Sequence, residues 1–278
     1  MNAPSTGSPT AGSGELRQRV ASALVLAAGV LVITWLGGWP FRIVWALAAG
    51  VIAYEWFVIA NGPRPIIAGL AVALVGIAAL HAPLPPAALA GLAAVAGLAA
   101  AVTSMQVQNG RLLEACGLIY ASALAILVPL LRDLPLIGLG LILWSFAVTW
   151  FTDIAAYFTG RTLGGPKLMP AVSPKKTWSG ATGGTLAGVL GGIAIWSLAP
   201  SFGVVPPGTL MAVAAASLLA SILSQAGDLF ESAFKRRFGA KDSGHLIPGH
   251  GGFMDRLDGY WAVIVFAGAV LCLVQAWN

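Results

Sequence analysis

Long apolar runs follow one another along this chain, separated by short polar stretches. No Asp, Glu, Lys or Arg occurs in the 46 residues between Arg64 and Arg111, or in the 51 residues between Lys176 and Asp228. A helix needs about 20 apolar residues to cross a bilayer core of about 30 Å. The runs do not alternate apolar and polar residues, as the strands of a membrane barrel do. The pattern therefore predicts several membrane-spanning helices.

The apolar runs accommodate nine predicted spans, which makes the chain an all-α, polytopic integral membrane protein. We expect a disordered cytoplasmic tail over 1–19, because its start is polar and rich in Pro and Gly. N-terminal transmembrane helices follow over 20–134, and a C-terminal catalytic transmembrane region occupies 135–278. The predicted spans cover 20–36, 41–60, 66–81, 85–103, 112–131, 135–158, 179–199, 207–228 and 259–277.

The charged residues are few, 9% of the chain, and they fix the expected orientation. With a cytoplasmic N-terminus, the basic loops at Arg64, Arg111, 159–178 and 229–258 all lie in the cytoplasm, as the positive-inside rule requires. The net charge of +5 then orients the helices and needs no nucleic-acid partner. In a bacterium this membrane would be the inner, cytoplasmic membrane.

Small residues inside the spans indicate packing. Gly184, Gly188 and Gly192 recur every four residues, a spacing that lets two membrane helices approach closely. We expect helix packing from this motif, and glycine-rich faces are also compatible with a homodimer. Cys116 and Cys272 lie in apolar segments, which predicts buried thiols and no disulfide framework.

Two carboxylates fall near the predicted cytoplasmic ends of spans. Asp153 lies in WFTDIAAYFTGR and Glu55 in AYEWF. An ionisable side chain at such a depth is costly, so it marks either a functional site or a residue that reaches the interface. For Asp153 the second alternative includes an ion pair with Arg161. For Glu55 the two alternatives have equal weight.

The segment 164–180, GGPKLMPAVSPKKTWSG, is basic and rich in proline. Its lysines are Lys167, Lys175 and Lys176, and Ser173 and Thr177 stand among them. Lysine ammonium groups suit phosphate, although an ordinary cytoplasmic loop is basic as well. The segment has no phosphate-binding GxxxxGK[ST] sequence.

A helix over 224–238 sorts its side chains onto separate faces. Asp228, Glu231, Ser232 and Lys235 fall at i, i+3, i+4 and i+7, on one face. Phenylalanines recur every four residues on another face. We therefore expect an amphipathic helix along the lipid interface, with its phenylalanines toward lipid and its carboxylates toward a polar cleft.

The segment from Pro248 to Gly252 predicts a sharp turn with free backbone N–H groups, which can bind anions. Asp255 and Asp258 follow at the start of the last helix. Carboxylates beside a basic loop suit Mg²⁺ that is shared with substrate phosphates. Zinc does not fit, because His245 and His250 have no cysteine beside them.

The tract SAFKRRFGAKDSGHLIPGHGGFMDRLD, from Ser232 to Asp258, resembles the signature of phosphatidate cytidylyltransferases. DIAAY from Asp153 and SPKKT from Ser173 are similar to further motifs of this family, in the same order. The resemblance covers roughly 145–260. It implies a reaction of CTP with phosphatidate at the cytoplasmic face of the bilayer, giving CDP-diacylglycerol and pyrophosphate.

The resemblance also implies roles for individual residues. Asp228 and Asp255 would hold Mg²⁺, with Glu231 beside them and a second, monovalent or divalent, cation. Lys175 and Asp153 join these two aspartates as expected catalytic residues. The expected substrate- and phosphate-binding residues are Ser173, Lys176, Thr177, Lys167, Ser232, Lys235, Arg236, Lys241, Asp242, His250, Gly251, Gly252 and Arg256.

Other functions remain open on the sequence alone. Another CTP-dependent membrane enzyme, such as a polyprenol kinase or a synthase for a different lipid phosphate, is the nearest alternative. A transporter is the alternative from another class, and it predicts ionisable residues spread through the bilayer midplane. The charges of this chain gather instead in two loops and at helix ends.

Overall fold

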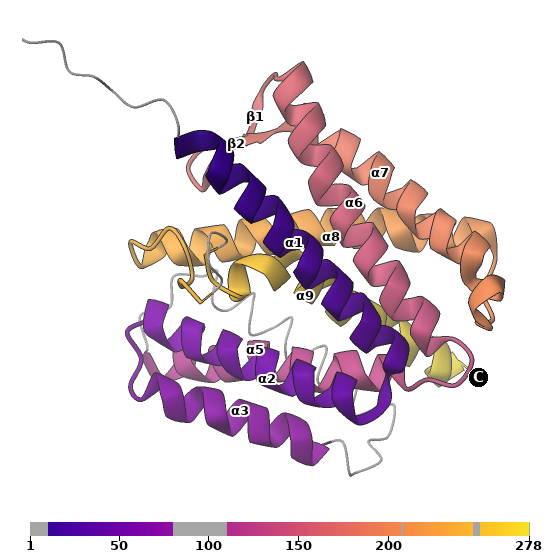
Figure 1. Cartoon of the computed structure of the whole chain (residues 1–278), viewed down its shortest axis with the longest axis horizontal. Helices are drawn as coiled ribbons and strands as arrows, with labels where there is room; N and C mark the ends of the chain where they lie inside the picture. Colours follow the sequence, from indigo (N-terminus) through magenta and orange to yellow (C-terminus); the bar gives the residue numbers. More distant parts are fainter. Residues whose placement is uncertain (1–10, 80–109, 207, 247–250, 278) are drawn as a thin grey trace, which may run out of the picture.

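The computed structural model describes residues 11–79, 110–206, 208–246 and 251–277 (Figure 1). The described part is mostly helical, as predicted. Its helices are α1 (Ala11–Leu36), α2 (Gly38–Ile59), α3 (Pro65–Ala79), α5 (Gly110–Arg132), α6 (Gly138–Leu163), α7 (Trp178–Leu198), the short 3-10 helix η1 (Ala199–Phe202), α8 (Leu210–Arg237) and α9 (Met254–Trp277).

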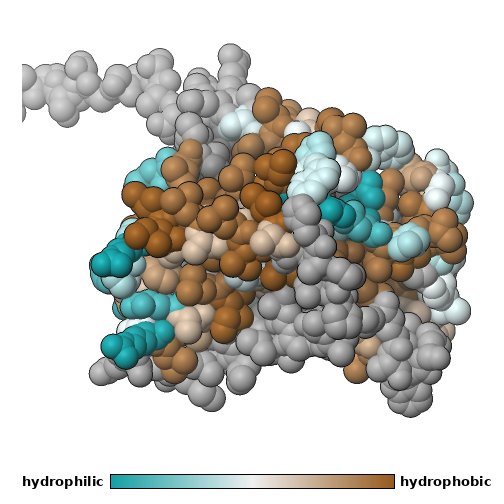
Figure 2. Space-filling model, turned by 90° about the horizontal axis from the view of Figure 1, so that it is seen from below, coloured by the Kyte–Doolittle hydropathy of each residue, from teal (hydrophilic) through white to brown (hydrophobic). Residues whose placement is uncertain are grey.

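Six of these helices are long and apolar enough to cross a membrane, namely α2, α5, α6, α7 with η1, α8 and α9. Two shorter apolar helices cover Ser22–Leu36 and Pro65–Ala78. The chain is therefore an integral membrane protein. The span expected at 85–103 lies outside the described residues, so the count of nine stays a prediction. Apolar side chains cover most of the coloured surface in Figure 2.

The structure differs from the expected elements in two places. Residues 11–19, which we expected in a disordered tail, belong to α1, because Glu15, Leu16, Arg17 and Gln18 are good helix formers. The basic segment is a hairpin of two short antiparallel strands, β1 (Lys167–Met169) and β2 (Ser173–Thr177), rather than a loop in an all-helical chain. Its prolines favour this extended backbone.

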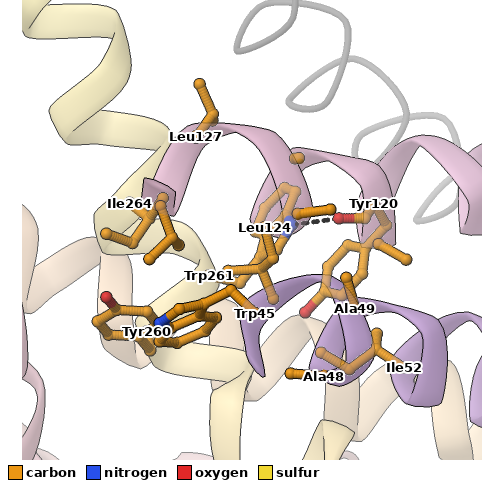
Figure 3. Close-up of a cluster of buried hydrophobic side chains, with 14 of the residues drawn as sticks. Trp45, Ala48, Ala49, Ile52, Tyr120, Leu124, Leu127, Tyr260, Trp261 and Ile264 are labelled. Carbon is orange, nitrogen blue, oxygen red and sulfur yellow. Dashed lines mark hydrogen bonds between the residues drawn. The ribbon is translucent and has the colours of Figure 1, made fainter. Parts of the chain in front are cut away.

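The helices form two groups that share a core. α2, α3 and α5 lie together on one side, α1, α6 and α7 lie on the other, and α8 and α9 pass between them (Figure 1). Aromatic rings from distant parts of the chain stack in the core: the ring centroids of Trp45 and Tyr260 are 5.2 Å apart, and those of Tyr120 and Trp261 are 4.3 Å apart (Figure 3). The Trp261 indole donates to the Tyr120 carbonyl at 2.8 Å. These contacts join α2 and α5 to α9.

The glycine motif packs helices within the chain, as predicted. Gly184, Gly188 and Gly192 are buried on α7. A Cβ at Gly188 would clash with the Thr152 hydroxyl on α6 and would lie 2.9 Å from the Ser221 hydroxyl on α8. The two hydroxyls bond each other at 2.7 Å. Because these glycines face α6 and α8 of the same chain, they give no support to a homodimer. Cys116 and Cys272 are buried thiols.

We expect Gly188→Ala to destabilise the protein by about 1–3 kcal/mol, because the methyl group overpacks the contact between α6, α7 and α8. The matched control is Gly29→Ala on α1, where no atom lies within 4 Å of the added Cβ. Thermal unfolding of both variants in the same detergent measures the difference. Equal unfolding temperatures for the two variants would contradict the close packing described here.

Candidate functional site

The charged residues of the second half of the chain meet at one end of the molecule. α6 ends there, the β-hairpin follows, α8 ends there and α9 begins there (Figure 1). This arrangement follows from the chain path, because α6 and α8 run toward this end and α9 runs away from it. The expected site segments, far apart in sequence, therefore converge.

The hairpin and α8 are joined by an ion pair. Lys176 Nζ lies 2.5 Å from Asp228 Oδ2, and both side chains are about one-third exposed or less, at 27% and 33%. Asp153 is exposed on α6 and lies within electrostatic reach of both residues. Arg161 donates to the Tyr157 hydroxyl at 2.9 Å, so the ion pair between Arg161 and Asp153 is not supported.

A second lysine links α8 to α9. Lys235 Nζ lies 3.3 Å from Glu231 Oε1 and forms a close ion pair with Asp255 Oδ1. The Glu231 side chain is fully buried, and neither of its oxygens accepts a well-aligned hydrogen bond. Lys235 and Asp255 are each 12% exposed, so their charges are largely removed from water.

Asp258 belongs to the same group, as its place beside Asp255 at the start of the last helix suggested, although it was not among the residues given individual roles. Its Oδ1 accepts a hydrogen bond from the Gly259 amide at 2.6 Å, and the side chain lies within electrostatic reach of Asp228 and Glu231. Its position one turn after Asp255 was the available signal, because both side chains then lie near one face of α9. We call the following residues the carboxylate cluster: Asp153, Asp228, Glu231, Asp255 and Asp258.

Carboxyl groups outnumber cations in the carboxylate cluster. Among the described residues, its five carboxyl groups lie within electrostatic reach of Lys176, Lys235 and Arg256. Within the described ranges, no three acidic, histidine or cysteine side chains form a ready-made metal-binding group. Mg²⁺ does not need one, since it uses one or two protein carboxylates and takes its remaining ligands from phosphates and water. The surplus of carboxyl groups, and the Glu231 oxygens that have no well-aligned hydrogen-bond partner among the described residues, fit such a cation.

The structure gives a role to Glu55, for which the sequence left two alternatives open. It is 1% exposed on α2, and its carboxylate accepts three hydrogen bonds of 2.8 Å, from the Ser243 hydroxyl and the amides of Phe253 and Met254. The residue therefore bonds the segment that precedes α9. The signal in the sequence was a lone carboxylate in an apolar span.

In the described part of the expected anion-binding turn, a backbone amide binds a carboxylate of the protein itself. The Gly252 amide donates to Asp255 Oδ2 at 3.0 Å, and the Ser243 amide donates to the same oxygen at 2.9 Å. These N–H groups are therefore satisfied by the protein, and the expectation that they are free is wrong for Gly252. Gly251 has a φ of +82°, a backbone conformation that favours glycine. His250 lies outside the described residues.

The other expected site residues differ in their exposure and in their contacts. The Thr177 hydroxyl accepts the Gly180 amide at 3.1 Å and caps α7, so this side chain has a structural role. The Ser232 hydroxyl donates to Asp228 at 3.4 Å. Ser173 is half-buried. The exposed members of the set are Lys167, Lys175, Arg236, Lys241, Asp242 and Arg256.

The expectation that the phenylalanines of α8 face lipid is wrong. Phe234 is 3% exposed, and its ring centroid lies 4.0 Å from that of Trp56 on α2. The Phe230 ring packs against both Trp56 and Tyr120 of α5, with centroids 6.5 and 6.2 Å away. The end of α8 packs on the first half of the chain because aromatic partners are available there.

An apolar cavity of about 370 Å³ lies toward the opposite ends of α6, α7, α8 and α9. Trp144, Trp196 and Phe266 are among its lining residues. The lining carries no charged side chain, so this cavity does not suit a phosphate-bearing ligand. The charged end remains the candidate site.

Comparisons with known proteins identify the family of the chain. The sequence profile of the cytidylyltransferase family matches residues 17–274. The chain is 43% identical over 263 residues to the phosphatidate cytidylyltransferases of Brucella suis and Brucella melitensis, which covers 94% of this chain and 93% of each relative. It is 39% identical over 134 residues to the phosphatidate cytidylyltransferase of Staphylococcus saprophyticus, covering 48% of this chain and 50% of that protein.

Proposed function

This chain belongs to the cytidylyltransferase family, and we propose that it transfers the cytidylyl group of CTP to phosphatidate, giving CDP-diacylglycerol and pyrophosphate. The observation that carries the proposal is the similarity to phosphatidate cytidylyltransferases along 94% of the chain. The convergence of lysines and carboxylates at one end of a membrane-embedded helical protein supports it. One substrate is a lipid and the other is a water-soluble nucleotide, so their reaction belongs at a membrane surface.

The reaction that fits this site is a direct displacement. An oxygen of the phosphatidate phosphate attacks the α-phosphorus of CTP, and the bond from that phosphorus to the oxygen that bridges to the β-phosphate breaks. Pyrophosphate leaves with the electron pair of that bond. Such transfers depend chiefly on positioning and on neutralisation of phosphate charge, so no covalent protein nucleophile is required.

The lysines provide the positive charge that this reaction needs. In the structure Lys176 pairs with Asp228, and Lys235 is shared between Glu231 and Asp255. Lys167, Lys175 and Arg256 are exposed at the same end of the molecule, where phosphate oxygens can reach them. We assign these cations to the phosphates, together with Arg236 and Lys241, which are also exposed.

The residues that we propose for Mg²⁺ are Asp228, Glu231 and Asp255, with Asp153 and Asp258 adding negative charge nearby. When bound, the cation neutralises phosphate charge and orients the reacting groups. Lys176 and Lys235 pair with these carboxylates in the structure, so both ammonium groups lie next to the proposed cation site, where phosphate oxygens would be bound. The nature of a second cation stays a prediction.

We place the site on the cytoplasmic side, at the inner membrane if the organism is bacterial, because the basic residues favour this orientation. CTP is then available on the same side. A homodimer also stays a prediction. A transporter has less support than an enzyme, because the described ionisable residues of the second half gather at one end of the helices.

Transfer of radioactive label tests the proposed reaction. Purified protein in detergent receives phosphatidate, Mg²⁺ and CTP labelled on its α-phosphate, and we expect the label to enter the lipid fraction. CTP labelled on its γ-phosphate is the matched control, and its label should leave as pyrophosphate. If instead the γ-label enters a polyprenol and the α-label stays in solution, the protein is a kinase and the proposal is wrong.

A further inference from the structure

Among the described residues, the Glu55 carboxylate accepts its hydrogen bonds from a segment that follows it by nearly 200 residues. Its three donors, Ser243, Phe253 and Met254, are separated from it by 188, 198 and 199 residues. Gly244 and Gly252 pack so closely on this carboxylate that added Cβ atoms would lie 2.7 and 2.8 Å from its oxygens. The contact is therefore buried, specific in its donors and tightly packed.

The start of α9 explains why a carboxylate is needed here. The first amides of a helix have no partner within the helix, and negative charge near them is favourable. Four successive amides, from Gly252 to Asp255, are all bonded: the first to Asp255, the next two to Glu55, and the last to the Ser243 hydroxyl at 3.3 Å. Two carboxylates and one hydroxyl thus share the start of α9.

Ser243 connects the two carboxylates. Its hydroxyl donates to Glu55 at 2.8 Å, while its amide donates to Asp255 at 2.9 Å. The position of the Asp255 carboxylate relative to Lys235 therefore depends on where Glu55 holds Ser243 and the first turn of α9. Lys235 in turn contacts Glu231. A continuous set of polar contacts leads from α2 to the carboxylate cluster.

From this geometry we infer that Glu55 is a positioning residue, which fixes the Asp255 carboxylate through Ser243 and the start of α9 so that the carboxylate cluster can hold a divalent cation. The inference rests on the proposed function, since that function supplies the reason for a cation. Because Glu55 is 1% exposed and its carboxylate accepts three protein hydrogen bonds, we give it no direct contact with the proposed substrates. Outer partners that orient ligands of a metal typically change its affinity about 10- to 100-fold when they are replaced.

Binding of Mn²⁺ to the purified protein, followed by electron paramagnetic resonance without CTP or lipid, tests this inference. Glu55→Gln keeps the size of the side chain but leaves one acceptor oxygen for three donors. We expect its dissociation constant for Mn²⁺ to rise about 10- to 100-fold over the wild type. Glu114→Gln, which removes a half-buried carboxylate from neighbouring α5, is the matched control and should bind Mn²⁺ as the wild type does.

Ser243→Ala is the second variant, because it removes one of the three bonds to Glu55 and should weaken Mn²⁺ binding in the same direction. Hydrogen exchange of the Phe253 and Met254 amides should accelerate in Glu55→Gln. A residue that only stabilised the start of α9 would lower the unfolding temperature and leave the Mn²⁺ affinity of the folded protein unchanged.

The outcomes separate this inference from the proposed reaction. Unchanged Mn²⁺ affinity in folded Glu55→Gln overturns the inference, and so does a wild-type protein that binds no Mn²⁺. If Glu55→Gln does not fold, Ser243→Ala decides, and wild-type affinity in that variant overturns the inference. A wild-type protein that binds Mn²⁺ but moves no α-label into phosphatidate overturns the proposed reaction alone.

Discussion

Asp228→Asn should lower the rate of cytidylyl transfer by about 100- to 1,000-fold, the loss that typically follows removal of one electrostatic contributor to a transition state. The substitution removes a negative charge from the carboxylate cluster at the point where Lys176 meets α8. The amide cannot neutralise a cation or hold the ammonium group as the carboxylate does. The measurement is the initial rate of label transfer from α-labelled CTP into phosphatidate at saturating substrate.

The fold offers a matched control for this substitution. Asp133 pairs with Arg42 at 2.6 Å, with side chains 24% and 30% exposed, close to the 27% and 33% of Lys176 and Asp228. Partly exposed pairs of this kind contribute only about 0–1 kcal/mol to stability, so both variants should unfold near the wild-type temperature. Asp133→Asn should keep wild-type activity. Equal activity in the two variants would remove Asp228 from the site.

Lys235→Met should destabilise the protein by about 3–5 kcal/mol, the cost of removing one partner from a buried ion pair. Methionine retains an apolar chain of similar length but leaves Glu231, which is fully buried, and Asp255 without their cation. The free energy of unfolding, compared with the wild type in the same detergent, measures the loss. An exposed lysine gives the control: Lys241→Met should change stability by no more than about 0.5 kcal/mol.

A double substitution tests whether Lys235→Met destabilises the protein through the loss of a compensating charge or through the loss of packing. Lys235→Met combined with Glu231→Gln removes the buried negative charge together with its partner. This variant should be more stable than Lys235→Met alone, because a neutral amide costs less to bury than an uncompensated carboxylate. Glu231→Gln should also be measured alone. If it lowers the free energy of unfolding as much in the Lys235→Met variant as in the wild type, the two side chains do not interact as the structure describes.

The sequence predicted the described spans well because apolar length is a local property. The predicted spans 112–131 and 179–199 fall on α5 and α7, with ends that differ by a few residues. The shared face of Asp228, Glu231, Ser232 and Lys235 was also predictable, because helical spacing alone brings such residues together. The contacts of Lys235 with Glu231 and of Ser232 with Asp228 confirm that face.

Contacts between distant segments were not predictable from periodicity. The pattern identified the phenylalanine face of α8 but could not say whether lipid or protein covers it, and Trp56 proved to be the partner of Phe234. The role of Glu55 was hidden for the same reason, since its donors lie far along the chain. A short hairpin over Lys167–Thr177 was missed because its strands are only three and five residues long.

The long separation between Glu55 and its partners has a consequence for biosynthesis. A ribosome adds about 5–20 residues per second, so a span of 188 to 199 residues takes roughly 10 to 40 s to complete. Throughout this interval the nascent α2 carries a carboxylate whose donors do not yet exist, in a helix that must already enter the bilayer. The donors arrive only with Ser243 and the start of α9, so a chain that ends before Ser243 leaves the Glu55 carboxylate without these three hydrogen bonds.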